Sequence, residues 1–139
     1  MMKGSCLCGK VTFNLDIDPA VLNHTQVCHC RPCRKITGAT TSLNLTVSAT
    51  AFVLKSGNLK TVTTKHIDEG FEYSLSFCED CGSPIYAVPQ SVPDKRVMQV
   101  GTLDDIELLE QKPTAELNVK HRLGWVGQID GAEQKEKYV

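Results

Sequence analysis

Apolar and polar residues alternate along two segments of the chain, as they do in strands that bury one face. In residues 11–17 every second position is apolar, from Val11 to Ile17, and residues 71–77 repeat the pattern from Phe71 to Phe77. Weaker forms of this signal predict further strands at residues 42–47, 51–55, 60–64, 85–88 and 97–103. Only residues 32–37, which Gly38 follows, have the character of a short helical turn. The chain is therefore predicted to be mostly β.

The length and the continuity of the chain predict a single domain. A chain of 139 residues falls in the usual size range of one domain and can bury a core. No internal repeat, low-complexity run or linker separates the strand signals. We therefore expect one domain over residues 1–130, followed by a polar tail at residues 131–139 that frays.

Composition and charge narrow the classes of function. Hydrophobic residues make up 41% and charged residues 22% of the chain, as in ordinary globular proteins. The net charge of −1 argues against binding to nucleic acid or to a membrane surface through charge. No apolar run approaches the ~18 residues of a membrane span, and the start of the chain lacks the apolar core of a secretory signal. We expect a cytoplasmic protein, or at least one in a reducing compartment.

The seven cysteines of the chain are grouped rather than scattered. An odd number suits a disulfide framework poorly, whereas close pairs at distant positions are typical of zinc sites. Scattered core thiols would not group in this way, and a redox motif at one CxxC would leave the other cysteines unexplained. Zinc is the expected metal, with iron at a rubredoxin-like site as the alternative. The groups are Cys6-x-Cys8, Cys28-x-Cys30-x-x-Cys33 and Cys78-x-x-Cys81.

Local geometry explains how the first and last groups could share a metal. Residues two apart on a strand point to the same side, so we expect Cys6 and Cys8 to aim both sulfurs at one ion. The core positions of the following strand have the opposite parity, which predicts irregular backbone at Gly9, such as a β-bulge. Residues 78–82 directly follow a predicted strand and have the character of a zinc knuckle, a tight turn that carries two cysteine ligands.

The middle group, Cys28, Cys30 and Cys33, is called the triad below. Cys28 and Cys30 can share a strand face, and the turn at Arg31-Pro32 can bring Cys33 around to join them. Four thiolates close a zinc site, whereas three leave a position for water or for a substrate thiol, which the metal would hold deprotonated. The natural division joins the first and last groups at a closed structural site and leaves the triad open for chemistry.

An alternative division makes the triad a structural site that an outside ligand completes. His29 lies between two of its cysteines, but on a strand it would point to the opposite side. His24 and His121 are further possible ligands. The residues by themselves leave both divisions open.

Three motifs stand in order along the chain: Gly4-Ser5-Cys6-Leu7-Cys8-Gly9-Lys10-Val11, Cys28-His29-Cys30-Arg31-Pro32-Cys33-Arg34-Lys35 with Gly38, and Phe77-Cys78-Glu79-Asp80-Cys81-Gly82-Ser83. Together the motifs resemble the glutathione-dependent formaldehyde-activating enzyme family, which also includes centromere protein V. The resemblance implies an Mss4-like fold of packed antiparallel β-sheets with zinc knuckles. It also implies a second zinc at the triad, where the chemistry takes place, and a structural zinc at Cys6, Cys8, Cys78 and Cys81.

The resemblance further implies an activity of the carbon–sulfur lyase type. Glutathione and formaldehyde would combine at the triad to form S-hydroxymethylglutathione. Arg34, with Arg31 and Lys35 beside it, could attract the carboxylates of glutathione, or it could partly neutralise the thiolates. Trp125, in a segment that resembles the closing stretch of the family, could wall the substrate site or anchor the core.

A function of a different class is compatible with the same motifs. The domain could be a non-catalytic, zinc-stabilised protein-interaction module of the Mss4-like kind. Such a module is expected to expose a large apolar patch or to carry strong basic charge, and the net charge of this chain is near neutral. An enzyme whose partner is a small thiol such as glutathione is therefore the leading hypothesis. The sequence does not indicate an oligomeric state.

Overall fold

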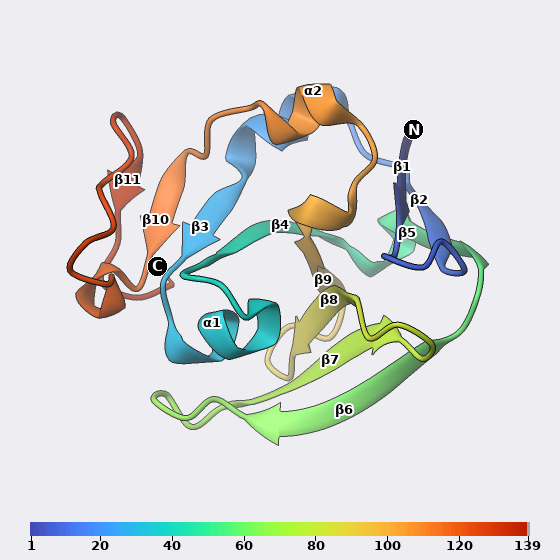
Figure 1. The fold of residues 1–139 in the computed structure, drawn as a ribbon, viewed down its shortest axis with the longest axis horizontal. Helices are drawn as coiled ribbons and strands as arrows, with labels where there is room; N and C mark the ends of the chain where they lie inside the picture. The colour runs from blue at the N-terminus through green and yellow to red at the C-terminus, as the bar shows by residue number, and fades with distance from the viewer. Residues whose placement is uncertain (139) are drawn as a thin grey trace.

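The computed structural model describes residues 1–138, which form mainly strands in two sheets (Figure 1). The smaller sheet has the strand order β1-β2-β5 and is antiparallel. Its strands are β1 (Met2–Ser5), β2 (Thr12–Leu15) and β5 (Phe52–Ser56). The prediction of a mostly β chain is confirmed, and the alternating residues of the first predicted strand form β2.

The larger sheet has the order β11-β10-β3-β4-β9-β8-β7-β6. Strands β6 to β9 form an antiparallel meander, which β4 extends on the side of β9. All of these strands were predicted, although the last ends before residue 100, where a turn of 3-10 helix begins. The bounds are Ser42–Ser48 for β4, Leu59–Lys65 for β6, Glu72–Cys78 for β7, Pro84–Pro89 for β8 and Lys95–Gln99 for β9.

Three short strands at the other edge of this sheet were not predicted. They are β3 (Gln26–Cys28), which is antiparallel to β4, β10 (Ala115–Leu117), which is parallel to β3, and β11 (Glu133–Gln134), which is parallel to β10. The larger sheet is therefore mixed rather than antiparallel throughout. Part of the tail expected to fray at residues 131–139 forms β11, because buried Glu116 accepts a hydrogen bond from Gln134. Residue 139 lies outside the described residues.

Helical segments are short, and the structure reports no helix among residues 1–138 that is long and apolar enough to cross a membrane. The predicted helical turn is α1 (Arg31–Thr37), and Gly38 ends it in the left-handed conformation, as expected. A second helix, α2, spans Ile106–Leu109. Turns of 3-10 helix occur at Pro19–His24, Ala49–Ala51, Val100–Thr102 and Val119–His121.

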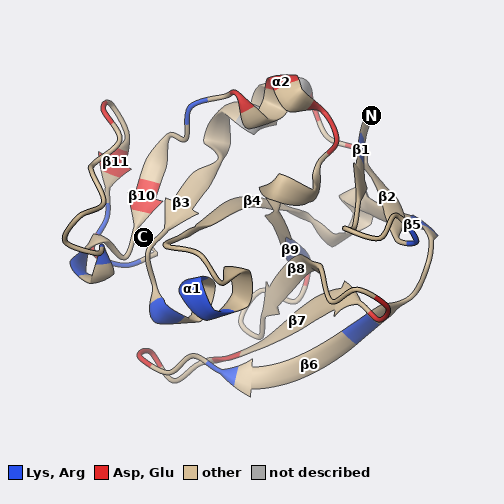
Figure 2. Cartoon of the chain, in the orientation of Figure 1, with Lys and Arg blue, Asp and Glu red and all other residues tan. Residues whose placement is uncertain are grey.

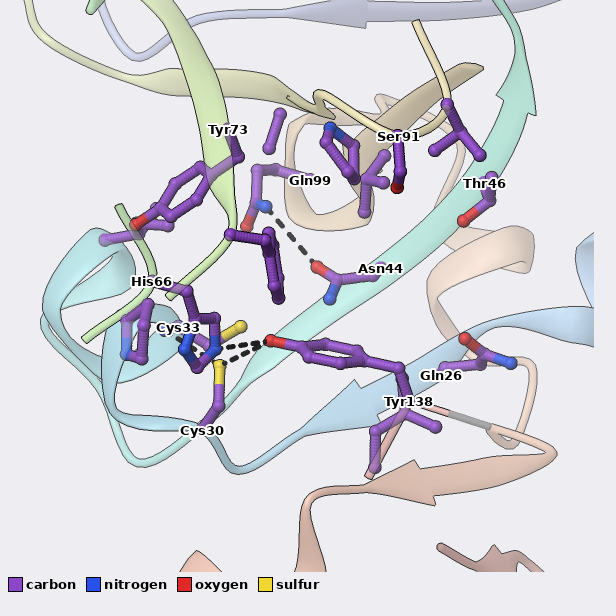
Figure 3. Close-up of a pocket in the computed structure, with 18 residues that line it drawn as sticks. Gln26, Cys30, Cys33, Asn44, Thr46, His66, Tyr73, Ser91, Gln99 and Tyr138 are labelled. Atoms are coloured by element: carbon purple, nitrogen blue, oxygen red, sulfur yellow. Dashed lines mark hydrogen bonds between the residues drawn. The ribbon is translucent and has the colours of Figure 1, made fainter. Parts of the chain in front are cut away.

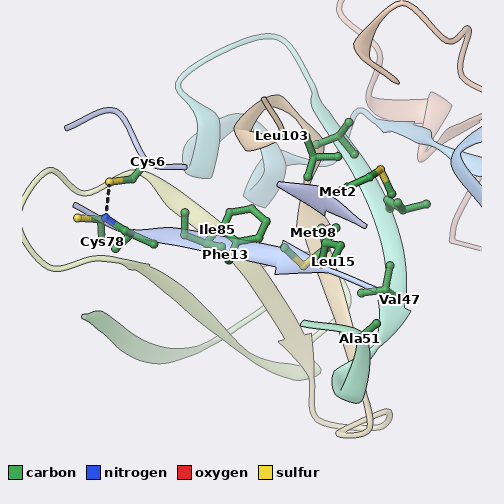
Figure 4. Close-up of a cluster of buried hydrophobic side chains, with 13 residues drawn as sticks. Met2, Cys6, Phe13, Leu15, Val47, Ala51, Cys78, Ile85, Met98 and Leu103 are labelled. Atoms are coloured by element: carbon green, nitrogen blue, oxygen red, sulfur yellow. Dashed lines mark hydrogen bonds between the residues drawn. The ribbon is translucent and has the colours of Figure 1, made fainter. Parts of the chain in front are cut away.

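The main hydrophobic core lies between the two sheets (Figure 4). Phe13 and Leu15 project from β2 toward Leu45, Ile85 and Met98 of the larger sheet, and all five side chains are buried. This burial explains the alternation along β2, because its odd-numbered residues face the core. Figure 4 also shows that Cys6 and Cys78 lie at one end of this core.

A second, smaller cluster of buried residues surrounds the triad. Cys28 and Cys30 pack there with Ala115 and Leu117 of β10, and Tyr138 packs against them. The two groups of cysteines therefore belong to different parts of the interior, one at the end of the main core and one between β3, β10 and α1.

Candidate metal centres

Two turns bring together Cys6, Cys8, Cys78 and Cys81, which we call the knuckle cluster. Their sulfur atoms all lie within 4.8 Å of one another. The Sγ atom of Cys8 is 3.5 Å from that of Cys6 and 3.9 Å from that of Cys78. Tetrahedral Zn–S bonds of ~2.3 Å would separate ligand sulfurs by roughly 3.7 Å, so this arrangement fits a closed tetrahedral metal site.

The pair of Cys6 and Cys8 does not lie on a strand, so that part of the prediction was wrong. A tight turn follows β1, in which the Gly9 N–H donates to the carbonyl oxygen of Cys6 (3.1 Å). The Gly82 N–H donates in the same way to the carbonyl oxygen of Cys78 (2.9 Å). Both glycines have a φ of +78°, a conformation that costs other residues about 1–2 kcal/mol. The irregular backbone predicted at Gly9 is confirmed, and it forms a second knuckle.

Hydrogen-bond donors surround the sulfurs of the knuckle cluster. The Val11 N–H donates to Cys6 Sγ (3.2 Å). Ser83 Oγ accepts the Leu7 N–H (2.9 Å) and lies 3.3 Å from Cys81 Sγ. Hydrogen bonding with Ser83 lowers the pKa of Cys81 to about 5. Such donors favour the thiolate, which is the form of cysteine that binds metals.

The triad forms around the start of α1. Cys28 is the last residue of β3, Cys30 caps the helix, and Cys33 lies in its first turn. The Cys33 N–H donates to Cys30 Sγ (3.3 Å), so the local geometry of the helix start brings these two residues together. The three sulfur atoms lie within 4.8 Å of one another, and Cys28 and Cys30 are fully buried.

Crowding of the three thiols shifts their pKa values in opposite directions. Hydrogen bonds from Cys28 and Cys33 lower the pKa of Cys30. Hydrogen bonding with Cys30 raises the pKa of Cys28 to about 11, and hydrogen bonds with Cys28 and Cys30 raise the pKa of Cys33. The protein alone therefore favours a single thiolate, and a cation is needed before all three can ionise. The triad could hold such a metal ion and leave one tetrahedral position free.

Two side chains from the C-terminal part of the chain donate to the triad. Asn118 Nδ2 donates to Cys28 Sγ (3.4 Å), and the Tyr138 hydroxyl donates to Cys30 Sγ (3.3 Å). Asn118 has a φ of +53°, which asparagine tolerates better than most residues do. Sequence reasoning missed both residues, because neither lies in a cysteine motif and only the fold brings them to the sulfurs.

A cavity of about 520 Å³ opens beside Cys30 and Cys33 (Figure 3). Most residues of its wall are apolar or aromatic: Pro32, Ile36, Phe71, Tyr73, Ala87, Pro89, Val92, Val97, Leu117 and Tyr138. Apart from His66 and the cysteines, its polar residues carry amides or hydroxyls: Gln26, Asn44, Thr46, Ser91 and Gln99. The triad therefore adjoins a space that could take a substrate.

His66 is buried beside this cavity and extends the hydrogen-bond chain of Tyr138 (Figure 3). His66 Nδ1 accepts the N–H groups of Asp68 (3.2 Å) and Glu69 (3.1 Å). Because Nδ1 is an acceptor, the proton of the neutral ring sits on Nε2, which lies 2.8 Å from the Tyr138 hydroxyl oxygen. Burial, and then the hydrogen bond to Cys30, raise the pKa of Tyr138. The donors thus point in one direction, from His66 through Tyr138 to Cys30.

Arg34, predicted to contact substrate, lies beside the triad but does not line the cavity. Its Nη1 donates to the carbonyl oxygens of His29 (2.8 Å) and His121 (3.0 Å). The neighbouring Arg31 is paired with the carboxylate of Asp68. Two of the three cations expected to attract a charged substrate therefore already have protein partners, and the third, Lys35, is exposed and does not line the cavity.

Trp125 is 77% exposed and does not line the cavity. Neither the wall position nor the core position considered for it is observed. His29 points away from the triad, as expected, and its Nε2 lies 2.8 Å from Oε1 of Glu116. Within the described part of the chain, no histidine joins either sulfur cluster. The division of the cysteines into the triad and the knuckle cluster is the one that the sequence favoured.

Buried Glu116 ties the C-terminal segment to β10. Its Oε2 accepts the Ile129 N–H (2.9 Å) and the Gln134 side-chain amide (2.7 Å). Burial alone would raise the pKa of Glu116, but hydrogen bonds from Ile129, Gln134 and His29 hold it below its ordinary value. This network fixes the segment that carries Tyr138 to the cavity.

Comparison with known proteins connects this geometry to a family. The sequence model of the family described as "Glutathione-dependent formaldehyde-activating enzyme" matches residues 1–121. A solved structure of a Rhodobacter sphaeroides protein, determined as a structural-genomics target, has a similar fold with a TM-score of 0.58 and 19% sequence identity. The similarity covers 96% of this chain and 99% of that one. No curated protein matches this chain in sequence.

Proposed function

Because the chain belongs to the glutathione-dependent formaldehyde-activating enzyme family, we propose that it is a zinc-dependent enzyme of the carbon–sulfur lyase type that joins a thiol to an aldehyde. The triad supports this proposal most directly, because three cysteines that could hold a metal ion and leave one ligand position free adjoin a cavity. The knuckle cluster has a complete tetrahedral ligand set and would hold a structural zinc.

Zinc suits the donor atoms of both clusters. Cysteine thiolates are among its preferred ligands, whereas magnesium and calcium prefer oxygen. A zinc ion bound by the triad would keep an entering thiol in its thiolate form and so supply a strong nucleophile near neutral pH. Asn118, Tyr138 and the Cys33 N–H donate to sulfurs of the triad and spread the negative charge of the thiolates.

The proposed reaction needs no oxidant or reductant. The thiolate sulfur attacks the carbonyl carbon of the aldehyde, a C–S bond forms, and the electron pair of the C=O π bond moves to oxygen. The oxygen then takes a proton, which balances the proton that the thiol released to solvent. With glutathione and formaldehyde the product is S-hydroxymethylglutathione, and the reverse reaction breaks the same C–S bond.

We assign the delivery of this proton to Tyr138. Its hydroxyl lies at the cavity wall beside Cys30, close to where an aldehyde would meet a thiol held by the triad (Figure 3). His66 Nε2–H donates to the tyrosine oxygen and would stabilise the charge that develops as the hydroxyl gives up its proton. Water that enters the cavity returns the proton.

The first test is exchange NMR on glutathione and formaldehyde with the protein and with its Cys33→Ala variant, at matched zinc content of the knuckle cluster. We expect the intact triad to accelerate formation of the adduct with at least one thiol, and we expect the variant to react at the uncatalysed rate. Several thiols should be compared. Acceleration of none of them by the intact protein would overturn the proposal and favour a zinc-stabilised interaction module.

The role of Tyr138 is tested by Tyr138→Phe, with Tyr86→Phe as the matched control. Loss of a proton donor should lower kcat by about 10²-fold or more, with little change in zinc content. The Tyr86 ring packs on Phe52 away from the triad, so its hydroxyl should matter little. Equal rates for the two variants would remove Tyr138 from the mechanism.

We also propose a cytoplasmic location and a small thiol as the partner. All seven cysteines are free, and both proposed zinc sites need them as thiolates. Reducing compartments keep thiols in that state, whereas oxidising compartments favour disulfides.

A further inference from the structure

The wall of the cavity restricts the kind of thiol that can reach the triad. Its side chains are mainly hydrocarbon or aromatic, such as Ile36, Phe71 and Val97. Among residues 1–138, no lysine, arginine, aspartate or glutamate lines it. A carboxylate group that entered this space would lose its water without gaining an ionic partner, which is strongly unfavourable.

Three cations of this region already have protein partners, and Lys35 of α1 is exposed and does not line the cavity. Arg31 is paired with Asp68, and the Arg34 guanidinium donates to two carbonyl oxygens. Lys120 Nζ lies 3.6 Å from a carboxylate oxygen of Glu69. Figure 2 shows charged residues on α1 and at the ends of β6, whereas β3 and β4, which form part of the cavity wall, carry none.

The cavity explains half of the apolar pattern predicted over residues 71–77. Phe71 and Tyr73 belong to that pattern, yet Phe71 is 37% exposed and Tyr73 is only half-buried, whereas Ser76 and Cys78 are buried. Phe71 and Tyr73 line the cavity. Their apolar surface therefore faces a space that a ligand can fill rather than the main core.

The polar groups of the cavity are suited to a neutral ligand. Gln99 Nε2 donates to Asn44 Oδ1 (3.3 Å), and this pair of amides offers hydrogen bonds but no net charge. The volume of about 520 Å³ falls within the ~300–1,000 Å³ range of sites for small organic molecules. An aromatic or branched aliphatic group would fill this space.

We propose that the triad serves an uncharged thiol with a hydrophobic body, whose sulfur lies at Cys30 and Cys33 and whose body fills the cavity. The inference rests on the proposed function, which brings a thiol to the triad. It adds to that function the class of thiol that the enzyme would take as substrate. Glutathione carries two carboxylates, which have no cationic lysine or arginine partner on this wall.

The test compares two thiols of nearly equal shape, para-methylbenzyl thiol and para-carboxybenzyl thiol, together with glutathione. Binding to the zinc-loaded protein is followed through the methyl NMR signals of Ile36, Val97 and Leu117. We expect the uncharged thiol to bind at least ~10-fold more tightly than its carboxylate analogue and than glutathione. Equal or tighter binding of either charged thiol, or no methyl shifts with the uncharged one, would overturn the inference.

A pair of matched variants tests the missing charge directly. Val92 lines the cavity and is 38% exposed, so Val92→Arg can add a cation without burying it in the core. Val53, on β5, is 46% exposed and does not line the cavity. Val92→Arg should tighten binding of para-carboxybenzyl thiol about 10-fold, and Val53→Arg should leave it unchanged. The same response from both variants would contradict the inference.

Failure of this inference can be told apart from failure of the proposed function, because binding is measured without aldehyde. Binding of the uncharged thiol without acceleration of any adduct would sustain the substrate class and refute the enzyme. Accelerated adduct formation with glutathione, together with equal or tighter glutathione binding, would sustain the enzyme and refute the substrate class.

Discussion

The knuckle cluster and the triad present the same ligand atom in two different settings. The knuckle cluster joins distant parts of the chain, since Cys8 and Cys78 are 70 residues apart in sequence. The triad comes entirely from residues 28–33. A metal that closes a long loop removes more entropy from the unfolded chain than one that closes a short loop. The knuckle cluster is therefore the one expected to contribute most to folding.

The two clusters also differ in how far their cysteines are exposed to solvent, and the difference is the opposite of what a structural and a reactive site would suggest. Cys8 of the knuckle cluster is exposed, whereas Cys28 and Cys30 of the triad are buried. The cluster proposed for chemistry is thus the more buried one, and the cavity beside it would give access that surface exposure does not. If the proposal holds, ligand number and adjoining space, rather than exposure, separate a reactive metal site from a structural one.

The largest expected effect comes from removing one ligand of each cluster. Binding of structural zinc contributes roughly 10–16 kcal/mol in small domains, which equals or exceeds the ~5–15 kcal/mol stability of most proteins. Cys78→Ala should therefore abolish cooperative thermal unfolding, measured by circular dichroism. Cys33→Ala should keep the cooperative transition with a smaller loss of stability. Equal losses, or the reverse order, would break the comparison between the clusters.

The number of zinc ions bound per chain gives the next test, because a variant of one cluster should lose only the zinc of that cluster. We expect one zinc ion per cluster in the purified protein, measured by mass spectrometry of the metal. Cys33→Ala should lose about half of this zinc, since the triad would keep too few ligands. Unchanged zinc content in this variant would contradict metal binding by the triad, and protein purified without zinc would contradict both sites.

Glu116→Gln tests whether the triad depends on the C-terminal segment. Replacing a buried carboxylate that accepts several hydrogen bonds should lower the free energy of unfolding by about 1–3 kcal/mol. It should also speed hydrogen exchange in residues 129–138 while the knuckle cluster keeps its zinc. Glu133→Gln is the control, because the Glu133 side chain is 70% exposed. Similar exchange in both variants would refute the anchoring role.

The stability that Glu116 provides should also depend on pH. Its pKa in the folded protein lies below the ordinary value of 4.5, so its contribution is fully present above that value. The contribution is lost as the pH falls through the lower, folded-state pKa. Denaturation curves should therefore show the stability difference between the native protein and Glu116→Gln shrinking at acidic pH. A difference that stays constant through this range would contradict the lowered pKa.

The smallest expected effect concerns the backbone of the knuckles. Gly82→Ala should cost about 1–2 kcal/mol, because φ is +78° there, although no atom would touch the added methyl group. Gly101→Ala is the control, since its φ is not positive and its surroundings are equally open. Chemical denaturation should show destabilisation in the first variant only. Equal stability of the two would show that the knuckle tolerates the strain.

The sequence determined those features that depend on neighbours a few residues apart. The alternation along β2 predicted the strand and its buried face, because successive residues of a strand point to opposite sides. Gly38 marked the end of α1, and the cysteine spacings identified both clusters. The same local reasoning failed for Cys6 and Cys8, because a strand and a tight turn can both bring residues two apart together.

Only the tertiary structure decided what surrounds the triad. Asn118 and Tyr138 reach its sulfurs because β10 pairs with β3 and because Glu116 holds the segment that follows β10. His66, just after β6 in the meander, reaches Tyr138. Strands of two or three residues have no detectable period, so neither this pairing nor the cavity between these elements could be predicted. The chemistry of the ligands is a local property of the chain. The cavity and the hydrogen-bond donors beside the triad arise from contacts between residues far apart in sequence.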